Sequence, residues 1–537
     1  MSKFFQRDRN VLALLIILFS IYAGFFIYKT SFVIDGERYY SLFDDAMVSM
    51  RYARNLVDGY GLVMNPGERV EGYTNFLWVL YMAAVHLLPV AQSKISIIIQ
   101  ITGALLLVVN LFFVRKIALL ISGNNSYVAS AALFLTAFYL PLINWSLQGM
   151  EVGLQTLIMS IAVWRTIISI NNNKCPWGTY VLLGISTLVR IDMTVPFVGI
   201  WLFIVIVKPK LRKKNLLAGG MLLLLFLGTQ TLARVLYYGD PFPNTYYLKM
   251  TGYPLFLRIT RGFIVFWNFI RNMNLLLFLV PVVTIIFSYT RSRAILAIVV
   301  VLQMLYSVYV GGDAWEDLGG SNRYIAFVMP LFFALFSCGI FIIGKAGAGL
   351  CEKLTFLPNK VVLFILNYHY ILLIIISFIQ FNSNSGFLSM KGILMLEPPP
   401  LVTLNQSMVE RALLIKRITT PEARIAVTWA GAIPYFSERY IVDMLGKTDR
   451  IIARGNMRTV SGQEKYTFFL PGHLKYDYAH SIGIEKPDAV LQFWGDLEEA
   501  ELYMAGKYAR LTVAGKLFYL RNGSKNILWN KFMKNKP

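Results

Sequence analysis

Long apolar segments separated by short charged connections follow one another from the start of the chain to about residue 380. A helix needs ~20 mostly apolar residues to cross the hydrocarbon core of a membrane. The segments are 11–28, 75–90, 95–114, 127–143, 152–169, 177–189, 193–207, 215–236, 273–290, 294–310, 324–344 and 361–380. This pattern predicts a multi-pass α-helical membrane protein.

The first apolar segment, Val11 to Tyr28, follows the basic residues Lys3, Arg7 and Arg9. A signal peptide has the same beginning, but no small-residue cleavage site follows here. We therefore expect a retained anchor whose N-terminus lies in the cytoplasm.

Basic residues in the short connections indicate how many of these segments cross. They are Arg115, Lys116, Lys174, the cluster at 208–214, Arg291, Arg293, Lys345, Lys353 and Lys360. If all twelve segments crossed, these connections would face away from the cytoplasm. If 75–90 lies in the interface or re-enters instead, all of them fall on the cytoplasmic side, as the positive-inside bias expects. We expect about eleven transmembrane helices, with everything after Gln380 outside the cytoplasm.

The region 381–537 has a different composition, with many charges and three consecutive prolines at 398–400. Short alternating runs predict strands, and two longer periodic runs predict helices. The strands are expected at 424–428, 440–442 and 488–492, and the helices at 404–418 and 497–505. About 150 residues are enough for an independent core. The chain therefore divides into a membrane domain, 1–380, and an extracytoplasmic α/β domain, 381–537.

Composition agrees with this division. The 537 residues are 56% hydrophobic and only 15% charged, against about 45–50% apolar and about 25% charged in ordinary soluble domains. Lys and Arg exceed Asp and Glu by 51 to 29, which gives a net charge of +22. The basic residues lie between apolar segments rather than on a soluble basic face, which excludes a nucleic-acid partner. The three cysteines have no CxxC spacing, so neither a disulfide scaffold nor a cysteine zinc site is expected.

The first outer loop, 29–75, contains two adjacent carboxylates, Asp44 and Asp45. From there to residue 58, apolar and polar residues alternate with helical spacing, which predicts a short helix lying flat on the membrane and ending at Gly59. We expect Asp45 to be its first residue and Asp44 to precede it, freer to point into a cavity. Two interpretations stay open: a simple helix cap, favoured by the helix dipole, and a catalytic site under the polar, glycine-rich stretch 59–75.

Further charged residues lie near the outer ends of the expected spans. They are Glu151, Arg190, Asp192, Lys249, Asp313, Glu316, Asp317 and Arg323, and Arg51 lies on the flat helix. A charge at a span end commonly extends to water. Because all of these face the side of the acidic pair, they predict a shared polar cavity.

Six stretches, in order along the chain, resemble one family. They are DDAMVSMRYARNLVDGYGLVMNPGERVEGYTNFLW at 44–78, QGMEVGL at 148–154, DPFPNTYYLK at 240–249, GGDAWEDLGGSNRY at 311–324, YIVDMLGKTDRIIARG at 440–455 and GHLKYDY at 472–478. The chain resembles the mycobacterial terminal arabinofuranosyltransferase (AftB) group and its LphB-like relatives, which are GT-C membrane glycosyltransferases.

The resemblance implies a GT-C fold with a catalytic Asp on membrane-parallel helices in the first outer loop. It also implies transfer of a sugar from a polyprenyl-phosphate carrier to a hydroxyl of a cell-envelope glycan, outside the bacterial inner (plasma) membrane. The sugar would be arabinofuranose or another pentose or hexose. Asp44 and Asp45 match the family's acidic pair. The added Glu316 and Asp317 depart from the family pattern and leave the role of Asp313 open.

Such a transfer needs a base for the acceptor hydroxyl and cations for the leaving phosphate. Asp44, slightly favoured over Asp45, would be the base. Arg51, Arg190, Lys249 and Arg323 are the candidate phosphate ligands, and Glu151, Asp192 and Asp313 are further substrate-binding candidates. Direct displacement would invert the sugar, whereas a covalent route would need a second carboxylate such as Glu151. A divalent cation, Mg²⁺ or Mn²⁺, stays open, because arginine alone can bind a monophosphate. No other cofactor is expected.

A transporter or flippase of a lipid-linked sugar is the alternative function. Transporters of this size commonly show paired repeats or helices broken near the bilayer midplane, and the sequence shows neither. The charges at the outer span ends favour an enzyme.

Overall fold

The computed structural model describes residues 2–170, 172, 174–316, 322–351, 359–383, 390–399, 401–459, 466 and 469–533. Asp317, Lys353 and Pro400 lie outside the described residues.

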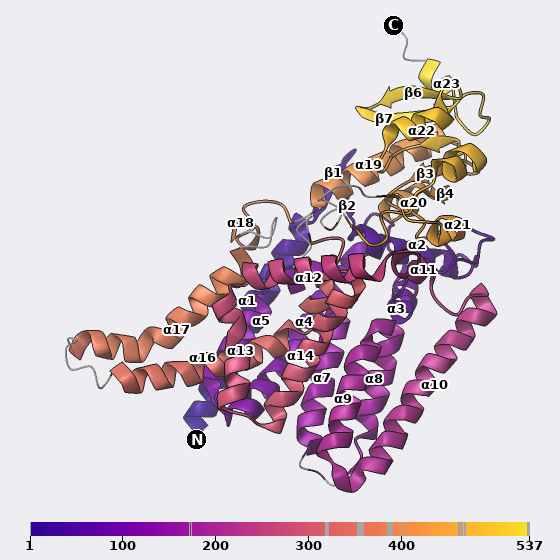
Figure 1. The fold of residues 1–537 in the computed structure, drawn as a ribbon. Coiled ribbons are helices and arrows are strands. Elements are labelled where there is room, and N and C mark those ends of the chain that lie inside the picture. The colour runs from indigo at the N-terminus through magenta and orange to yellow at the C-terminus, as the bar shows by residue number, and fades with distance from the viewer. Residues whose placement is uncertain are drawn as a thin grey trace.

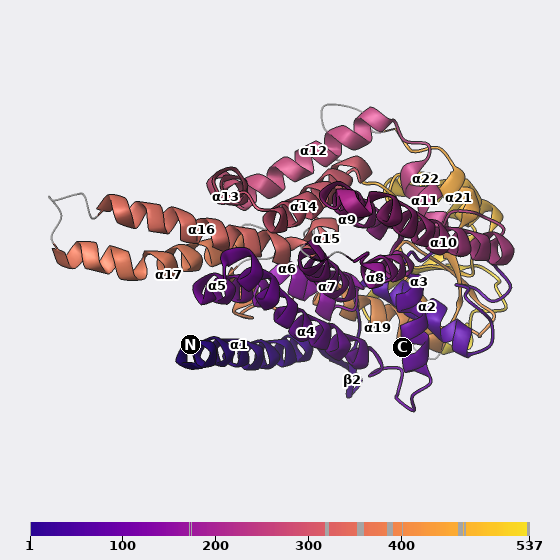
Figure 2. The same cartoon turned by 90° about the horizontal axis from the view of Figure 1, so that it is seen from below.

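The expected apolar segments form helices that pack into a bundle (Figure 1). They are α1 (Ser2–Lys29), α3 (Phe76–His86), α4 (Ser96–Ser122), α5 (Ser126–Ala137), α6 (Leu140–Leu147), α7 (Val152–Ile170), α8 (Trp177–Val189), α9 (Thr194–Val207), α10 (Arg212–Tyr238), α13 (Leu275–Phe287), α14 (Arg291–Val310), α16 (Met329–Cys351) and α17 (Asn359–Ser383). Helices α16 and α17 run side by side and project from the bundle (Figure 2).

By length and composition, six helices of the described residues can each cross a membrane, or eight if each of two bent pairs counts as one span. The pair α5 and α6 bends by 50°, and α12 (Leu255–Asn272) meets α13 at 93°. Helix α3 has 11 residues, about half of what a straight crossing needs. Helices α8 and α9 are also short, with 13 and 14 residues. The count of eleven spans stays a prediction.

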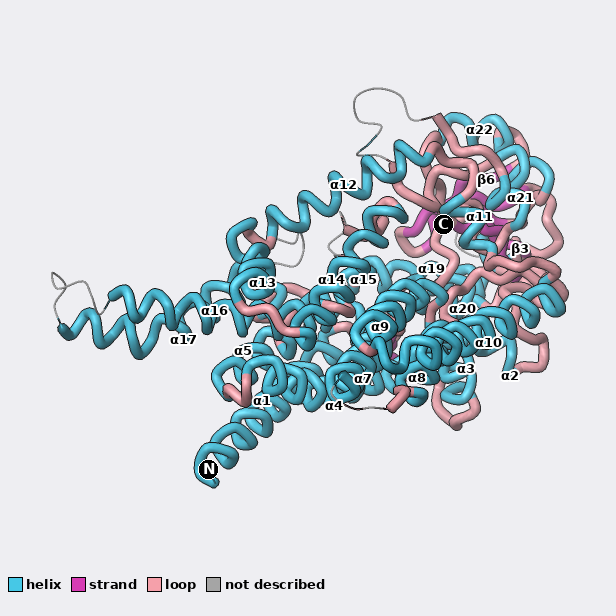
Figure 3. The backbone as a smooth tube through the Cα atoms, turned by 60° about the horizontal axis from the view of Figure 1, so that its bottom comes forward, coloured by secondary structure: helices cyan, strands magenta, loops and turns pink. Residues whose placement is uncertain are grey.

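Helix α12 is a feature that the apolar segments did not predict. Its charged residues interrupt the apolar run, yet Arg258 and Arg261 are buried while Phe256, Phe263 and Trp267 are exposed. This amphipathic helix lies across the end of the bundle that carries the C-terminal domain (Figure 3). That arrangement is typical of a helix in the membrane interface.

The first outer loop folds into a hairpin and a helix before α3. Strands β1 (Ser31–Ile34) and β2 (Glu37–Tyr40) pair antiparallel around Asp35 and Gly36, whose φ angles are 51° and 82°. Both angles suit a tight Asp-Gly hairpin turn. Helix α2 (Asp44–Val57) follows and packs against α3.

The C-terminal domain lies at the end of the bundle opposite the α9–α10 connection (Figure 1). Its five-stranded sheet has the order β4-β3-β5-β7-β6, with β3 parallel to both β4 and β5, and β7 antiparallel to β5 and β6. The strands are β3 (Arg424–Val427), β4 (Tyr440–Asp443), β5 (Ala489–Val490), β6 (Tyr508–Val513) and β7 (Lys516–Arg521). The expected α/β architecture is confirmed, and the β6–β7 hairpin adds to it.

Helices flank this sheet and join it to the membrane domain. They are α18 (Met390–Ile393), α19 (Val402–Ile418), α20 (Ala432–Ser437), α21 (Arg450–Arg454), the π-helix η4 (Ala479–Ile484), α22 (Leu497–Met504) and α23 (Asn530–Met533). Helix α20 packs against both α19 and α2. One cluster of buried apolar side chains runs from α1 through the bundle into the sheet, so the two domains are docked.

Candidate active site

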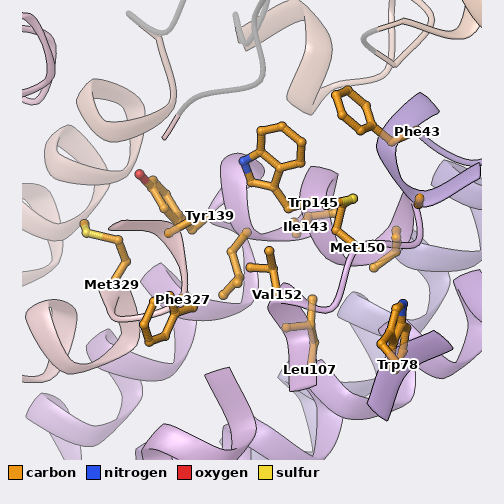
Figure 4. Packing of buried hydrophobic residues seen from close by; sticks show 14 of the residues in the cluster. Phe43, Trp78, Leu107, Tyr139, Ile143, Trp145, Met150, Val152, Phe327 and Met329 are labelled. Carbon is orange, nitrogen blue, oxygen red and sulfur yellow. The ribbon is translucent and has the colours of Figure 1, made fainter. Parts of the chain in front are cut away.

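Helix α2 presents its acidic pair beside the C-terminal domain. The helix begins at Asp44, one residue earlier than expected, so both carboxylates lie in its first turn, where the helix dipole favours negative charge. The preceding residue, Phe43, packs edge-on against Trp145 at 5.0 Å and Trp315 at 4.6 Å between ring centroids. Figure 4 shows Phe43 and Trp145 in this buried layer. This packing fixes where α2 starts.

The main cavity lies between α2, the bundle and the C-terminal domain. Its empty volume is about 1040 Å³, which includes space open to the solvent. Seven of the site residues expected from the sequence line it: Asp45, Glu151, Arg190, Asp192, Lys249, Asp313 and Arg323. The short elements η1 (Ile191–Met193), α11 (Asn244–Met250) and α15 (Arg323–Ala326) carry three of them, Asp192, Lys249 and Arg323. These charged residues, predicted to share a polar cavity, therefore line one cavity in the structure.

Arg323 connects two carboxylates of the cavity. Its Nη1 lies 2.9 Å from Asp45 Oδ2, and its Nε lies 3.0 Å from Asp313 Oδ2. The guanidinium also stands over the Trp145 ring, 5.6 Å from the centroid. Because all three charged groups are largely removed from solvent, the loss of one would leave a buried charge without compensation.

Lys447 is a cavity residue that the sequence analysis did not single out. Its Nζ bonds to Asp45 Oδ1 from the loop that follows β4. Thr448 N donates to Asp443 Oδ2 at 2.7 Å, and Leu445 N donates to Asp443 Oδ1 at 3.0 Å, so this loop folds around one carboxylate. Lys447 lies within the stretch 440–455, one of the six stretches that carry the family resemblance. That resemblance was the sequence signal that could have identified it.

Arg190 is held by two other carboxylates. Its Nη1 lies 2.9 Å from Glu151 Oε1, and its Nη2 lies 2.8 Å from Asp192 Oδ2. Asn75 Nδ2 donates to the second oxygen of Glu151 at 2.9 Å, and Ser49 Oγ donates to Asn75 at 3.0 Å. Arg190 and Glu151 therefore already have their partners within the protein.

Lys249 differs from the other cavity cations. Among the described residues, its Nζ has no hydrogen bond and no carboxylate within salt-bridge distance. Burial, and then the neighbouring charge of Arg323, lower the pKa of Lys249 to about 8, with Lys447 adding to the effect and Asp45 opposing it. An unpaired ammonium beside two further cations creates a positive potential that attracts anions.

The two adjacent carboxylates have opposite electrostatic surroundings. Burial acts to raise the pKa of Asp45, but Lys447, Arg323 and Lys249 together hold it well below the usual value. For Asp44, burial raises the pKa to about 6, opposed in part by the hydrogen bond from Ala432. Ala432 N donates to Asp44 Oδ1 at 2.9 Å, so Asp44 turns toward the C-terminal domain rather than into the main cavity. The expectation that Asp44 precedes the helix and points into the shared polar cavity is wrong.

Asp44 instead lines a second cavity, which it shares with Asp45. Arg51 lines neither of these two cavities. Its Nε donates to the Met64 carbonyl at 3.4 Å, and burial together with the charge of Arg54 lowers its pKa to about 10. Arg51 thus lies with the 59–75 loop rather than in either cavity.

A divalent metal site is not evident in the geometry. Among the described residues, no three His, Cys, Asp or Glu side chains gather closely enough to hold a metal ion. The carboxylate oxygens of Asp45 are already bound by Arg323 and Lys447.

Comparison with known proteins supports the fold. Residues 402–520 match a family described as a domain of unknown function, DUF8728. Among curated protein sequences, none matches the chain. The structure is similar to that of ArnT from Cupriavidus metallidurans bound to undecaprenyl phosphate, with a TM-score of 0.52 and 10% identity over 95% of this chain and 98% of that one.

A second similar structure is the oligosaccharyltransferase AglB from Archaeoglobus fulgidus in complex with an inhibitory peptide and a dolichol-phosphate. Its TM-score is 0.52, with 10% identity over 96% of this chain and 74% of that one. The apo form of the Archaeoglobus oligosaccharyltransferase gives a TM-score of 0.51 and 10% identity over 97% and 75%. The chain is therefore a multi-pass membrane protein with the GT-C fold and a C-terminal α/β domain.

Proposed function

We propose that this protein is a membrane glycosyltransferase that moves a sugar, a pentose or a hexose, from a polyprenyl-phosphate carrier to a hydroxyl of a cell-envelope glycan. The reaction would take place on the outer side of the bacterial inner membrane, with the N-terminus in the cytoplasm. The similar ArnT and AglB structures, which hold undecaprenyl phosphate and dolichol-phosphate, support a lipid phosphate as donor.

The observation that carries the proposal is the grouping of three cations around one carboxylate. Lys249, Arg323 and Lys447 all lower the pKa of Asp45. Lys249 lacks a carboxylate partner among the described residues, so its positive charge is available to bind a donor phosphate. Arg323 and Lys447 then lie close enough to share the phosphate charge, as charge-assisted hydrogen bonds favour.

Phosphate binding would also prepare Asp45 to act as a base. In the structure, Lys447 and Arg323 hold its pKa low, which makes Asp45 a weak base. A phosphate that attracts these two cations would weaken their hold on Asp45 and raise its pKa toward the range of an effective base.

In the transfer step, the acceptor oxygen forms a bond to the anomeric carbon while its proton passes to Asp45. The bond between that carbon and the phosphate oxygen breaks, and the phosphate keeps the electron pair. The cations stabilise the charge that develops on it. A single displacement of this kind inverts the anomeric centre. Glu151 has both oxygens bound, by Arg190 and Asn75, which supports this route over a covalent one through Glu151.

The test compares the envelope glycans of cells that contain the intact protein with those of cells that contain the Asp45→Asn variant. Mass spectrometry should show glycans that lack one sugar unit in the variant cells, together with an accumulated polyprenyl-phosphate sugar. Identical glycans in both, with the variant present in the membrane at the normal level, would contradict the proposed function.

A further inference from the structure

The second cavity lies where the first outer loop, α11 and the C-terminal domain meet. Its empty volume is about 730 Å³, part of it open to the solvent. Asp45, Lys249, Ala314 and Lys447 line both this cavity and the main one. A molecule in the second cavity would therefore reach Asp45 from the side of the C-terminal domain.

Four aromatic rings form a large part of the remaining wall of the second cavity. Trp315 and Trp429 have ring centroids 5.2 Å apart, and His473 and Trp494 also lie 5.2 Å apart. Trp315 and His473 stand edge to face at 6.4 Å, which links the two pairs. Four rings from four separate segments of the chain thus form one continuous aromatic surface.

Polar side chains complete the lining of this cavity. Besides the shared Asp45, Lys249 and Lys447, they are Asp44, Thr428, Asp443 and His473. Burial, and then the charge of Lys249, lower the pKa of His473 to about 4, so its ring is neutral at pH 7. Among the described residues, none of the three indole N–H groups has a hydrogen-bond partner, which leaves them free to donate to a ligand.

This combination fits a sugar ring. The C–H face of a sugar is apolar and packs on aromatic faces, which carry partial negative charge, while its hydroxyls need a few well-placed polar groups. A polyprenyl chain would not need the carboxylate, and a phosphate would be repelled by Asp44. The cations that suit a phosphate lie on the wall shared with the main cavity.

We propose that the second cavity is the acceptor subsite and binds a neutral sugar unit of the acceptor glycan on Trp315, Trp429 and Trp494. The acceptor hydroxyl would then point at Asp45, and the donor phosphate would occupy the main cavity on the other side of the shared wall. This assignment rests on the proposed glycosyltransferase function and names the substrate that the C-terminal domain helps to bind.

Binding of methyl glycosides of arabinofuranose, galactose, glucose and mannose to the full-length protein in detergent tests the subsite by saturation-transfer NMR. At least one glycoside should bind at millimolar concentration. Trp429→Ala and Trp494→Ala should weaken this binding about tenfold or more, as removal of a central aromatic contact does. Trp429→Phe should retain part of it.

Trp177→Ala is the matched control, because Trp177 is exposed and begins α8 at the end far from Arg190. It should bind the glycoside like the wild type. Thermal unfolding identifies any variant that fails to fold. If an alanine variant does not fold, the binding of the Trp429→Phe variant tests the subsite instead. Binding unchanged by both alanine variants, or no binding of any glycoside to the wild type, would overturn the acceptor subsite.

Binding of undecaprenyl phosphate, followed by native mass spectrometry, separates this result from the proposed function. The tryptophan variants should bind it as the wild type does, because neither Trp429 nor Trp494 lines the main cavity. A wild-type protein that binds a glycoside but no undecaprenyl phosphate would contradict the donor assignment and leave the saccharide subsite supported.

Discussion

Arg323 Nη1 lies 2.9 Å from Asp45 Oδ2, although 278 positions separate the two residues in the sequence. The pair joins the first outer loop to the short helix α15 of the membrane domain. Lys447 binds the other oxygen of the same carboxylate from the C-terminal domain. Asp45 is therefore the residue at which all three parts of the molecule meet.

Asp45→Asn should lower sugar transfer by ~10²–10⁴-fold, because an amide keeps the size of the side chain but cannot accept the acceptor's proton. Asp44→Asn should be milder, since an Asn side chain still accepts the hydrogen bond from Ala432. Initial rates of the purified variants measure both effects. Equal losses in the two variants would mean that Asp44 shares the chemistry.

Lys249→Ala should weaken the use of the donor by ~1.5–3 kcal/mol, the usual contribution of a charge-assisted hydrogen bond. The effect should appear in the donor KM and in the affinity for undecaprenyl phosphate. Lys94→Ala is the control, because Lys94 is an exposed lysine outside both cavities. An unchanged donor affinity in Lys249→Ala would remove Lys249 from the phosphate site.

The affinity for undecaprenyl phosphate should also depend on pH. The pKa of Lys249 is lowered to about 8, so its side chain is charged below pH 8 and loses its proton as the pH rises above that value. Affinity should be steady near pH 7 and fall by up to ~10-fold per pH unit above 8. The same titration of Lys249→Ala should be nearly flat. A wild-type profile that stays flat to pH 10 would contradict the assignment.

Asn244 should act as a positioning residue for Lys447. Its Nδ2 donates to the carbonyls of Gly446, Lys447 and Asp449 at 3.0, 3.1 and 3.1 Å, from the first residue of the helix that carries Lys249. In the Asn244→Ala variant, the fold decrease in kcat should be larger than the fold change in the acceptor KM. In a double-mutant cycle, Asn244→Ala should have little further effect once Lys447 is Ala, because the two act through the same contact. If the effects of Asn244→Ala and Lys447→Ala on kcat were fully additive, Asn244 would have a purely structural role.

Topology is open to a direct test. Alkaline phosphatase fused after Pro537 should be active, because the distribution of basic connections places the C-terminus outside the cytoplasm. A cytoplasmic fluorescent reporter at the same position should stay dark. The reverse outcome would overturn the expected span count, including the placement of 75–90 outside the set of crossing segments.

Local sequence patterns were sufficient for much of the fold. Three kinds of element could be predicted from the spacing of apolar residues alone, because that spacing is a property of residues close together in the chain. They are the apolar segments, the helix from the acidic pair to Gly59, and the strands near 424 and 440. Helix α12 escaped this approach because its arginines interrupt the apolar run, and they are buried only through contacts such as the one from Arg258 Nε to the Tyr309 carbonyl.

The roles within the site depended on tertiary structure. The sequence determined that the acidic pair lies at the start of a helix in the first outer loop, and it predicted cations on the same side of the membrane. It did not determine which cation is free, because Arg190 and Arg323 find their carboxylates through folding, whereas Lys249 finds none among the described residues. Successive residues of a helix point ~100° apart around its axis. For this reason Asp44 faces Ala432, Asp45 faces Arg323 and Lys447, and only the folded chain gives the two neighbours opposite pKa shifts.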